Sequence, residues 1–360
     1  MAHSPLLIPK PIIKAIILSL LLSHALLAKA AVVLQYHHIS NDTPFSTSTA
    51  PALFRQHIKY LIDNEFNISS LPDIVKALQR EQPSPEKTVA ITFDDGFISV
   101  YSHAFPILKA HNIPFTIFIN TDPIQTKRPS HLSWEQLEEM KEHGATIANH
   151  THEHSHLIYS GAYATNSSKM AKDKWRKAFI DEVESAQKLI NNRLNQDIKL
   201  FAYPYGEFDQ RSNELLAEMG YVGFGQHSGA IGVGMNLQSL PRYPASNSYG
   251  KFPQIETKLN SIAFENIEFK PVFGIISDKA ENPPKLYIQG DKSALNSINC
   301  FGSSVGELPK TNIDMTTLLI KSEHSFSSRR FRYNCTAKSP TTGHFMWASI
   351  PWVNLTEDRQ

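Results

Sequence analysis

The sequence has almost no net charge and little low-complexity or repeated sequence, and these absences exclude several classes of protein. Its 360 residues carry 35 Lys and Arg against 34 Asp and Glu, so the formal charge is only +1. A nearly neutral chain lacks the basic surface with which proteins bind nucleic acid or anionic membranes. With 41% apolar and 19% charged residues, the composition is globular. We therefore expect about two folded domains and no nucleic-acid partner.

The chain also lacks an apolar run near its N-terminus that is long enough to span a bilayer. The run at 15–27 has 13 residues, follows Lys10 and Lys14, and precedes Ala28-Lys29-Ala30. A basic start, a short apolar run and a small-residue cleavage site are typical of a secretory signal peptide. We expect removal of residues 1–30, export to the periplasm or the medium, and no stable membrane insertion; an uncleaved anchor is the alternative. Cleavage removes three lysines and no acidic residue, and takes the charge from +1 to −2.

Cysteine is scarce, with only Cys300 and Cys335 in the whole chain. In an exported protein two cysteines favour a disulfide, because an oxidising compartment lets the bond persist. The Cα atoms of the pair should then lie about 4.4–6.8 Å apart. Two free buried thiols are the alternative. In either case these residues indicate structure and not chemistry.

Segments typical of strands and helices alternate over residues 31–255. Repeated βα units predict a parallel sheet wrapped by helices, with functional residues at the C-terminal ends of the strands. Asp94-Asp95, His150 and 203–205 all follow expected strands, so one edge of one sheet can hold them together. The expected strands are 32–36, 88–93, 114–119, 145–148 and 199–202, and the expected helices include 169–193, 210–220 and one that Ser133 begins with a capping box to Gln136.

The pattern changes after about residue 260, where short apolar stretches alternate with Gly, Pro, Ser and Asn clusters. We expect a second, smaller, all-β domain at 262–360 that resembles a sandwich. Its apolar residues Ile267, Phe269, Phe273 and Ile275 fall on one alternating face. Further strands are expected at 315–320, 330–335 and 345–348.

Two motifs carry side chains suited to metal-assisted chemistry. Thr92-Phe93-Asp94-Asp95-Gly96 places two carboxylates at the end of an expected strand, although adjacent Asp residues before Gly also form simple turns. His150-Thr151-His152-Glu153-His154-Ser155-His156 places four imidazoles in seven residues. If this segment forms a helical turn, either His150 with His154 or His152 with His156 lies on one face. Two His and one carboxylate, here Asp95, form a catalytic metal set that leaves positions open for water and substrate.

With a third motif, Phe201-Ala202-Tyr203-Pro204-Tyr205-Gly206, these motifs occur in the order and spacing of the polysaccharide deacetylases, the family 4 carbohydrate esterases. The chain resembles that family over about residues 31–249. The resemblance implies an α/β fold, a deformed (β/α) barrel, and hydrolysis of an acetyl group. It also implies that the backbone N–H of Tyr205 holds the oxyanion. Its further implications are Asp94 as general base, and Asp95, His150 and His154 as ligands of a divalent metal, first of all Zn²⁺, with other transition metals as alternatives.

The chain departs from the usual family pattern at two points. Ala202 stands where the family usually has Arg, and the late Leu-x-His motif that usually supplies the general acid is missing. Instead, Tyr36-His37-His38 follows the first expected strand, and Leu240-Pro241-Arg242 occurs later. These features resemble the subgroup that deacetylates the poly-N-acetylglucosamine of biofilms. By that resemblance His37 is the acid, with His38 and His227 as alternatives, and Arg242 orients Asp94.

The expected activity is therefore metal-dependent removal of N-acetyl groups from an amino-sugar polysaccharide, with release of acetate. Peptidoglycan, chitin oligomers or an O-acetyl ester are alternative substrates of the same chemistry. A carbohydrate-binding protein without activity is an alternative of another class, but such a protein would be expected to lose at least one of Asp94, Asp95, His150 and His154. The C-terminal β-domain could contact glycan or protein, or only cap the barrel.

Overall fold

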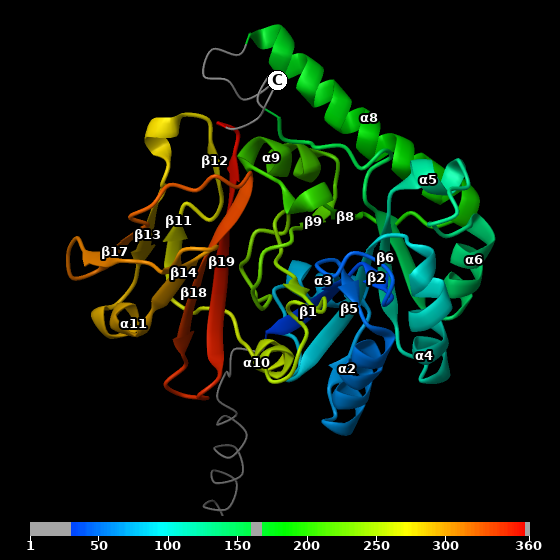
Figure 1. Ribbon diagram of the computed structural model, residues 1–360, viewed down its shortest axis with the longest axis horizontal. Helices are drawn as coiled ribbons and strands as arrows, with labels where there is room; N and C mark the ends of the chain where they lie inside the picture. Colours follow the sequence, from blue (N-terminus) through cyan, green and yellow to red (C-terminus); the bar gives the residue numbers. More distant parts are fainter. Residues whose placement is uncertain (1–29, 160–167, 357–360) are drawn as a thin grey trace, which may run out of the picture.

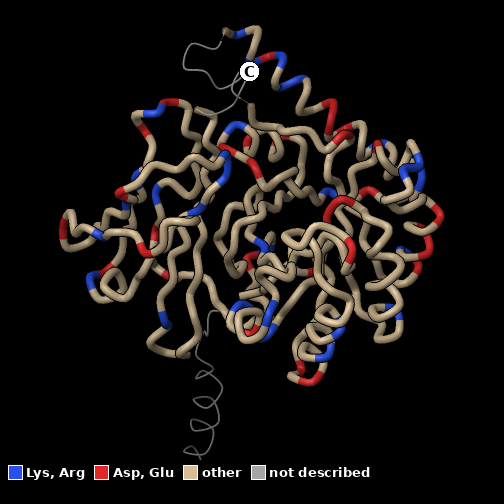
Figure 2. The backbone as a smooth tube through the Cα atoms, viewed as in Figure 1, with Lys and Arg blue, Asp and Glu red and all other residues tan. Residues whose placement is uncertain are grey.

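Figure 1 shows the computed structural model, which describes residues 30–159 and 168–356. The signal peptide expected at 1–30 lies outside these residues, apart from Ala30. Blue to green elements form an α/β part, and yellow to red strands form a second part beside it (Figure 1). Basic and acidic residues are interspersed along the described chain (Figure 2). None of the helices in these ranges has both the length and the apolar character that membrane crossing requires.

The α/β part is built on an eight-stranded sheet whose pairings are all parallel. The strand order is β10-β1-β5-β6-β7-β8-β9, with β4 beside β5. Leu240, just before β10, bridges Phe224 of β9, so that the two edges of the sheet meet there. The strands are β1 (Ala31–Tyr36), β4 (Asn67–Ile68), β5 (Thr88–Asp95), β6 (Phe115–Ile119), β7 (Ala145–Asn149), β8 (Leu200–Ala202), β9 (Val222–Phe224) and β10 (Tyr243–Pro244).

The barrel is irregular because β5 changes its partner along its length. β4 pairs with Thr88 and Val89, whereas β6 pairs with β5 only from Thr92 onward. This architecture confirms the expected deformed (β/α) barrel. A small pair, β2 (His38–Ile39) and β3 (Ser48–Thr49), lies outside the main sheet. The helical segments are α2 (Pro51–Asp63), α3 (Leu71–Gln79), η1 (Val100–Ala104), α4 (Phe105–Ala110), α5 (Thr121–Gln125), α6 (Trp134–Glu142), α8 (Lys169–Leu194), η2 (Pro204–Gly206), α9 (Gln210–Glu218) and α10 (Gln254–Leu259).

Strand alternation produces separate cores on the two faces of the sheet. In β1, Leu34 and Tyr36 belong to a core shared with α2, α4 and α6, while Val33 belongs to a second core shared with α3. All six residues of β1 are buried, as expected for a parallel sheet covered on both faces. Ser133 forms the expected capping box with Gln136 at the start of α6.

The C-terminal part contains two sheets that share one apolar core. The four-stranded sheet has the order β11-β13-β17-β16, and the five-stranded sheet has the order β12-β19-β18-β14-β15. Residues from both, such as Leu286 and Tyr333, pack in that core. The elements are β11 (Glu268–Lys270), β12 (Gly274–Ile276), η3 (Lys279–Glu281), β13 (Lys285–Gln289), α11 (Lys292–Ser297), β14 (Asn299–Gly302), β15 (Gly306–Glu307), β16 (Lys310–Asn312), β17 (Thr317–Lys321), β18 (Arg330–Lys338) and β19 (Phe345–Asn354).

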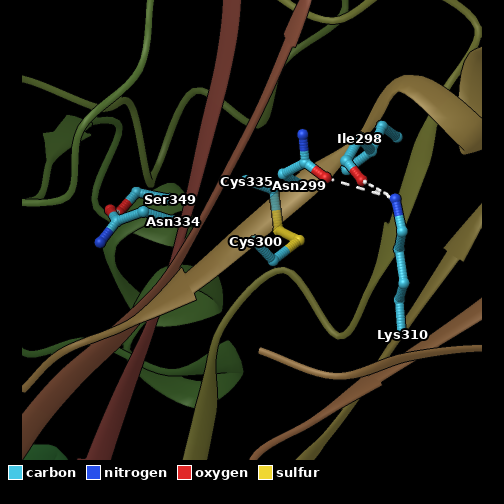
Figure 3. Close-up of a disulfide and its surroundings, with 7 residues drawn as sticks. All are labelled: Ile298, Asn299, Cys300, Lys310, Asn334, Cys335 and Ser349. Atoms are coloured by element: carbon cyan, nitrogen blue, oxygen red, sulfur yellow. Dashed lines mark hydrogen bonds between the residues drawn. A yellow bond between two sulfur atoms is a disulfide. The ribbon is translucent and has the colours of Figure 1, made fainter. Parts of the chain in front are cut away.

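The two cysteines form the expected disulfide, which joins β14 to β18 (Figure 3). Cys300 and Cys335 are directly opposite each other in this antiparallel pair. Their Cα atoms are 4.0 Å apart, slightly less than the expected range. Direct cross-strand partners approach to about 4.5 Å, so the strand pairing favours a short separation, and the observed one is shorter still.

One expectation for the C-terminal part was wrong. Ile267, Phe269, Phe273 and Ile275 do not lie on one face of one strand, because the chain bends at 271–273 and its two halves join different sheets. Phe269 enters the core between the two C-terminal sheets. Phe273 and Ile275 instead pack against a core that contains α9. Val353 of β19 is buried in the same core, so the two parts of the molecule share an apolar contact.

Candidate active site

The residues singled out by the motifs follow the C-terminal ends of neighbouring parallel strands. Asp94 and Asp95 end β5, His37 follows β1, His150 follows β7, and Tyr205 lies in η2 just after β8. The order β1-β5-β6-β7-β8 therefore brings segments that are distant in sequence to one end of the barrel. Functional residues of parallel α/β folds are usually found at this end.

Asp94 is fully buried and held by three hydrogen bonds. Arg242 donates from Nη1 to Oδ1 at 2.6 Å and from Nη2 to Oδ2 at 2.8 Å. Gln35 Nε2 donates to Oδ2 at 2.6 Å. Burial by itself raises the pKa of the Asp94 carboxyl, but the Arg242 guanidinium, together with His150 and His37, outweighs it and the net pKa is lowered. Asp94 is therefore ionised and fixed in orientation.

Asp95, His150 and His154 converge beside Asp94. The Nε2 atoms of His150 and His154 lie 3.2 and 3.3 Å from Asp95 Oδ1. One potential ligand atom from each residue lies within 4.8 Å of the others, and no further such group of three occurs in the described residues. Burial raises the pKa of Asp95, but the two imidazoles outweigh it and the pKa falls well below its usual value. Asp95 thus offers a carboxylate.

The donor atoms of this cluster fit a divalent cation. Asp95 Oδ1 and His150 Nε2 are buried and lack a hydrogen-bond partner, which is costly unless another group satisfies them. His150 Nδ1 lies 2.7 Å from the carbonyl oxygen of Ala202. Donation of the Nδ1 proton to this carbonyl leaves Nε2 free as a ligand, which is the usual arrangement of metal-binding histidines. Two imidazoles and one carboxylate suit zinc and other transition metals.

Several residues of the site have left-handed backbone conformations. The φ angles are 71° at Asp95, 71° at Thr151, 61° at His154 and 61° at Tyr205. In a regular strand Asp94 and Asp95 would point to opposite faces, and the positive φ at Asp95 breaks this alternation. Such conformations cost free energy in non-glycine residues and concentrate at functional sites.

The expected helical turn between His150 and His154 is absent, because the described residues 151–159 form an irregular loop. The N–H groups of His152 and Glu153 donate to the Glu182 carboxylate at 3.0 and 2.9 Å. Glu182 belongs to α8, and its carboxylate satisfies these two N–H groups from outside the loop. His150 and His154 still meet, but through left-handed backbone and not through helical spacing.

The alternative pair, His152 and His156, contacts other groups. His152 Nδ1 lies 2.9 Å from the hydroxyl of Thr121. His156 Nδ1 lies 2.9 Å from Oε2 of Glu207. Of the four histidines in this motif, His150 and His154 therefore lie in the cluster with Asp95, and His152 and His156 contact other residues.

Of the three histidines considered as general acid, His37 is nearest to Asp94. Its Nε2 atom lies 3.9 Å from Asp94 Oδ2, and its side chain is 18% exposed. The ring of His38 stacks on Phe97 at 3.6 Å between centroids, and burial lowers its pKa to about 4. His227 is buried against Phe208, and burial lowers its pKa to about 3. His38 and His227 are consequently uncharged at neutral pH.

The structure adds four residues that the sequence did not single out. Gln35 is the one polar side chain in the apolar segment Val32–Tyr36, and this isolated polarity was a usable signal. Glu207 is fully buried and forms ion pairs with Arg329 and, more distantly, Arg330. Both arginines come from the C-terminal part, 122 or more residues away, and no local pattern indicates such a contact.

The comparisons with known proteins agree with this arrangement. Residues 81–224 match the polysaccharide deacetylase family. A Bacillus subtilis protein named as a polysaccharide deacetylase, YxkH, is 29% identical over 215 residues, which cover 59% of this chain and 71% of that protein. The poly-β-1,6-N-acetyl-D-glucosamine N-deacetylase of Staphylococcus epidermidis is 25% identical over 237 residues, with coverage of 61% and 80%. The structure of IcaB from Ammonifex degensii superposes with a TM-score of 0.55 at 25% identity and covers 64% of this chain and 97% of its own.

Fold and site together define a deformed (β/α) barrel with an acidic and histidine-rich centre at the ends of its strands. Residues 81–224, which lie within the α/β part, match the polysaccharide deacetylase family, so this part contains a polysaccharide deacetylase domain. It is accordingly an enzyme of the class that removes acetyl groups from polysaccharides.

Proposed function

We propose that the protein is a metal-dependent N-deacetylase of a poly-N-acetylglucosamine-like polymer that releases acetate. The observation that carries this proposal is the convergence of Asp95, His150 and His154 beside the buried Asp94 carboxylate. The buried atoms His150 Nε2 and Asp95 Oδ1 have no hydrogen-bond partner, which supports metal binding in particular. A divalent cation held by Asp95, His150 and His154, most simply zinc, would lower the pKa of an attacking water and polarise an acetyl carbonyl.

In this mechanism Asp94 is the general base. Its carboxylate is ionised at neutral pH because Arg242 lowers its pKa, so it can accept a proton from the attacking water at Oδ1 or Oδ2. A low pKa also makes a carboxylate a weaker base, and the most effective base has a pKa near the working pH. Arg242 and Gln35 therefore contribute mainly orientation, and they hold both oxygens of Asp94 in place.

Two other groups complete the proposed mechanism. The backbone N–H of Tyr205 stabilises the oxyanion that develops on the acetyl oxygen. His37 donates a proton to the departing amine, since an amine leaves poorly unless it is protonated. His37 Nε2 lies 3.9 Å from Asp94 Oδ2, which is within ion-pair distance when the imidazole carries a proton. The half-buried His38 and the buried His227, both uncharged at neutral pH, are less suited to this role.

The named substrate of the staphylococcal relative supports a β-1,6-linked N-acetylglucosamine polymer. The test is acetate release by the full chain from a panel of defined polymers: poly-β-1,6-N-acetylglucosamine, chitin oligomers, peptidoglycan and an O-acetylated xylan. We expect the fastest release from the first. Preference for chitin oligomers or peptidoglycan would overturn the substrate assignment, and preference for the acetyl ester would overturn N-deacetylation.

Export and the domain division belong to the same proposal. The disulfide between Cys300 and Cys335 supports an oxidising location, as expected for a periplasmic or secreted protein whose signal peptide is residues 1–30. We place the catalytic domain at 31–255 and the β-domain at 262–360, each with its own apolar core. Cleavage at the expected site, detected by N-terminal sequencing of the exported protein, tests the first point.

A further inference from the structure

Strand β18 begins beside the candidate active site, although it belongs to the C-terminal sheets. Arg330 Nη1 donates to the carbonyl oxygen of Tyr205 at 3.0 Å, and its guanidinium carbon lies 5.2 Å from the centre of the Tyr205 ring. Arg329 donates from Nε and Nη2 to the two carboxylate oxygens of Glu207 at 2.9 and 3.0 Å. Two consecutive arginines of the β-domain thus contact the segment that follows β8 of the barrel.

This segment has a backbone that other contacts must hold in place. Tyr205 has φ 61° and ψ 0°, a left-handed conformation that a non-glycine residue keeps only when its surroundings fix it. Two hydrogen bonds within the turn, from Gly206 N to Tyr203 O and from Glu207 N to Pro204 O, close it locally. Arg330 adds a bond to the Tyr205 carbonyl from outside the barrel.

Glu207 anchors the other end of the segment. Its side chain has no exposed surface, and burial raises its pKa, but His156 and Arg329 outweigh that effect and lower it. The carboxylate is therefore ionised and depends on its partners, because a buried charge without a counter-charge is strongly unfavourable. The ring of its partner His156 stacks on Tyr205 with 3.9 Å between centroids. The Tyr205 ring in turn lies 4.6 Å from that of His154.

We propose that Arg329 and Arg330 are positioning residues of the deacetylase site, so that the β-domain is a required part of the enzyme and not a detachable module. The inference rests on the proposed function, in which the backbone N–H of Tyr205 faces the oxyanion. Arg330 holds Tyr205 by its carbonyl and its ring, and Arg329 holds Glu207 two residues later. A reacting group displaced by about 1 Å can lose roughly 100-fold in rate, so fixing this segment has a catalytic consequence.

The first test is amide hydrogen exchange of the segment 203–207 in the full chain, which needs no substrate. Arg330→Ala and Arg329→Gln should each exchange faster there than the wild type. Arg176→Ala is the matched control, since Arg176 is 49% exposed against 47% for Arg330 and also forms an ion pair, with Glu218. Exchange at the wild-type rate in both the Arg329 and the Arg330 variant would overturn the inference, and so would equal acceleration in the control.

The second test separates positioning from structure by kinetics on the acetylated polymer. Arg330→Ala should lower kcat by about 10–100-fold with little change in KM and unchanged metal content. Arg330→Lys should recover part of the loss, because its ammonium can still donate to the Tyr205 carbonyl, and it replaces Arg330→Ala if that variant does not fold. A change in KM alone would overturn positioning in favour of substrate binding. If the wild type releases no acetate, the proposed function fails, and the exchange experiment alone decides the inference.

Discussion

Arg242 and Asp94 are 148 residues apart in sequence and form a bidentate ion pair inside the barrel. Both side chains have no exposed surface. The family usually places an arginine at the position of Ala202, and here a guanidinium from a different strand end contacts the candidate base. The same chemical requirement, an ionised and oriented carboxylate, is thus met from another position of the fold.

The first prediction concerns the pH dependence that this pair imposes. Burial raises the pKa of Asp94 and Arg242 lowers it, so a weaker cation contact should let the pKa rise. Arg242→Lys keeps the positive charge but loses the bidentate contact with the carboxylate. We expect the acid limb of its kcat/KM profile to move to higher pH, because Asp94 must be ionised to act. An unchanged acid limb, with metal content equal to wild type, would remove Arg242 from control of Asp94.

A second prediction concerns the metal ligands. Asp95→Asn, His150→Ala and His154→Ala should each lower bound metal, measured by elemental analysis of the purified protein. The loss of affinity should exceed the roughly 10–100-fold that removal of an indirect partner costs. His152→Ala is the control, because His152 contacts Thr121 and not the cluster. Equal metal loss in the control would show that the whole His-rich loop binds the ion.

The same site should bind metal less well in acid. Burial lowers the pKa of His150, but the carboxylates of Asp95 and Asp94 outweigh it and raise the pKa above its usual value of 6.5. A proton therefore competes with the cation at His150 as the pH falls. Titration of metal affinity between about pH 8 and pH 5 should show this decrease, and a constant affinity would contradict it.

How much of this site the sequence could predict depends on how far apart in sequence the residues of each contact lie. Parallel strand order brings Asp94 and His150 to one edge, so local patterns sufficed for them. Glu182 of α8 accepts hydrogen bonds from the N–H groups of His152 and Glu153 in the irregular loop, and no spacing rule within the motif predicts contact with a distant carboxylate. Arg329 and Arg330 escape sequence analysis for the same reason. Helix α8 was predicted to within one residue, since its buried positions recur at helical spacing.

A fourth prediction uses the buried ion pair of Glu207. Its folded pKa is lowered, so its contribution to stability is present above its usual pKa of 4.5 and is lost as the pH falls through the folded value. Glu207→Gln should lower the free energy of unfolding at pH 7 by up to about 3–5 kcal/mol. Its difference from wild type should shrink below pH 4.5, as measured by urea unfolding. Glu218→Gln, which removes an exposed partner, should show little difference, and a pH-independent gap for Glu207→Gln would contradict the ionised carboxylate.

The last prediction concerns the identity of the general acid. No late Leu-x-His motif is present, whereas His37 follows β1 and its Nε2 atom lies 3.9 Å from Asp94 Oδ2. Positioned acid catalysis contributes about 10²–10⁴ in rate, and an amine leaving group needs it more than an activated alcohol does. His37→Ala should therefore lower kcat on an N-acetylated polymer by that order and leave metal content intact.

The control for the His37→Ala variant is a second substrate, an activated acetyl ester. An activated acetyl ester has a leaving group that departs without protonation, so His37→Ala should slow its hydrolysis far less than that of the amide. His38→Ala serves as the neighbouring variant, because the ring of His38 stacks on Phe97 and its pKa is lowered to about 4. Equal losses on ester and amide would show that His37 supports the site and does not donate the proton. A selective loss on the amide in His38→Ala, with none in His37→Ala, would assign the acid to the second histidine of the pair.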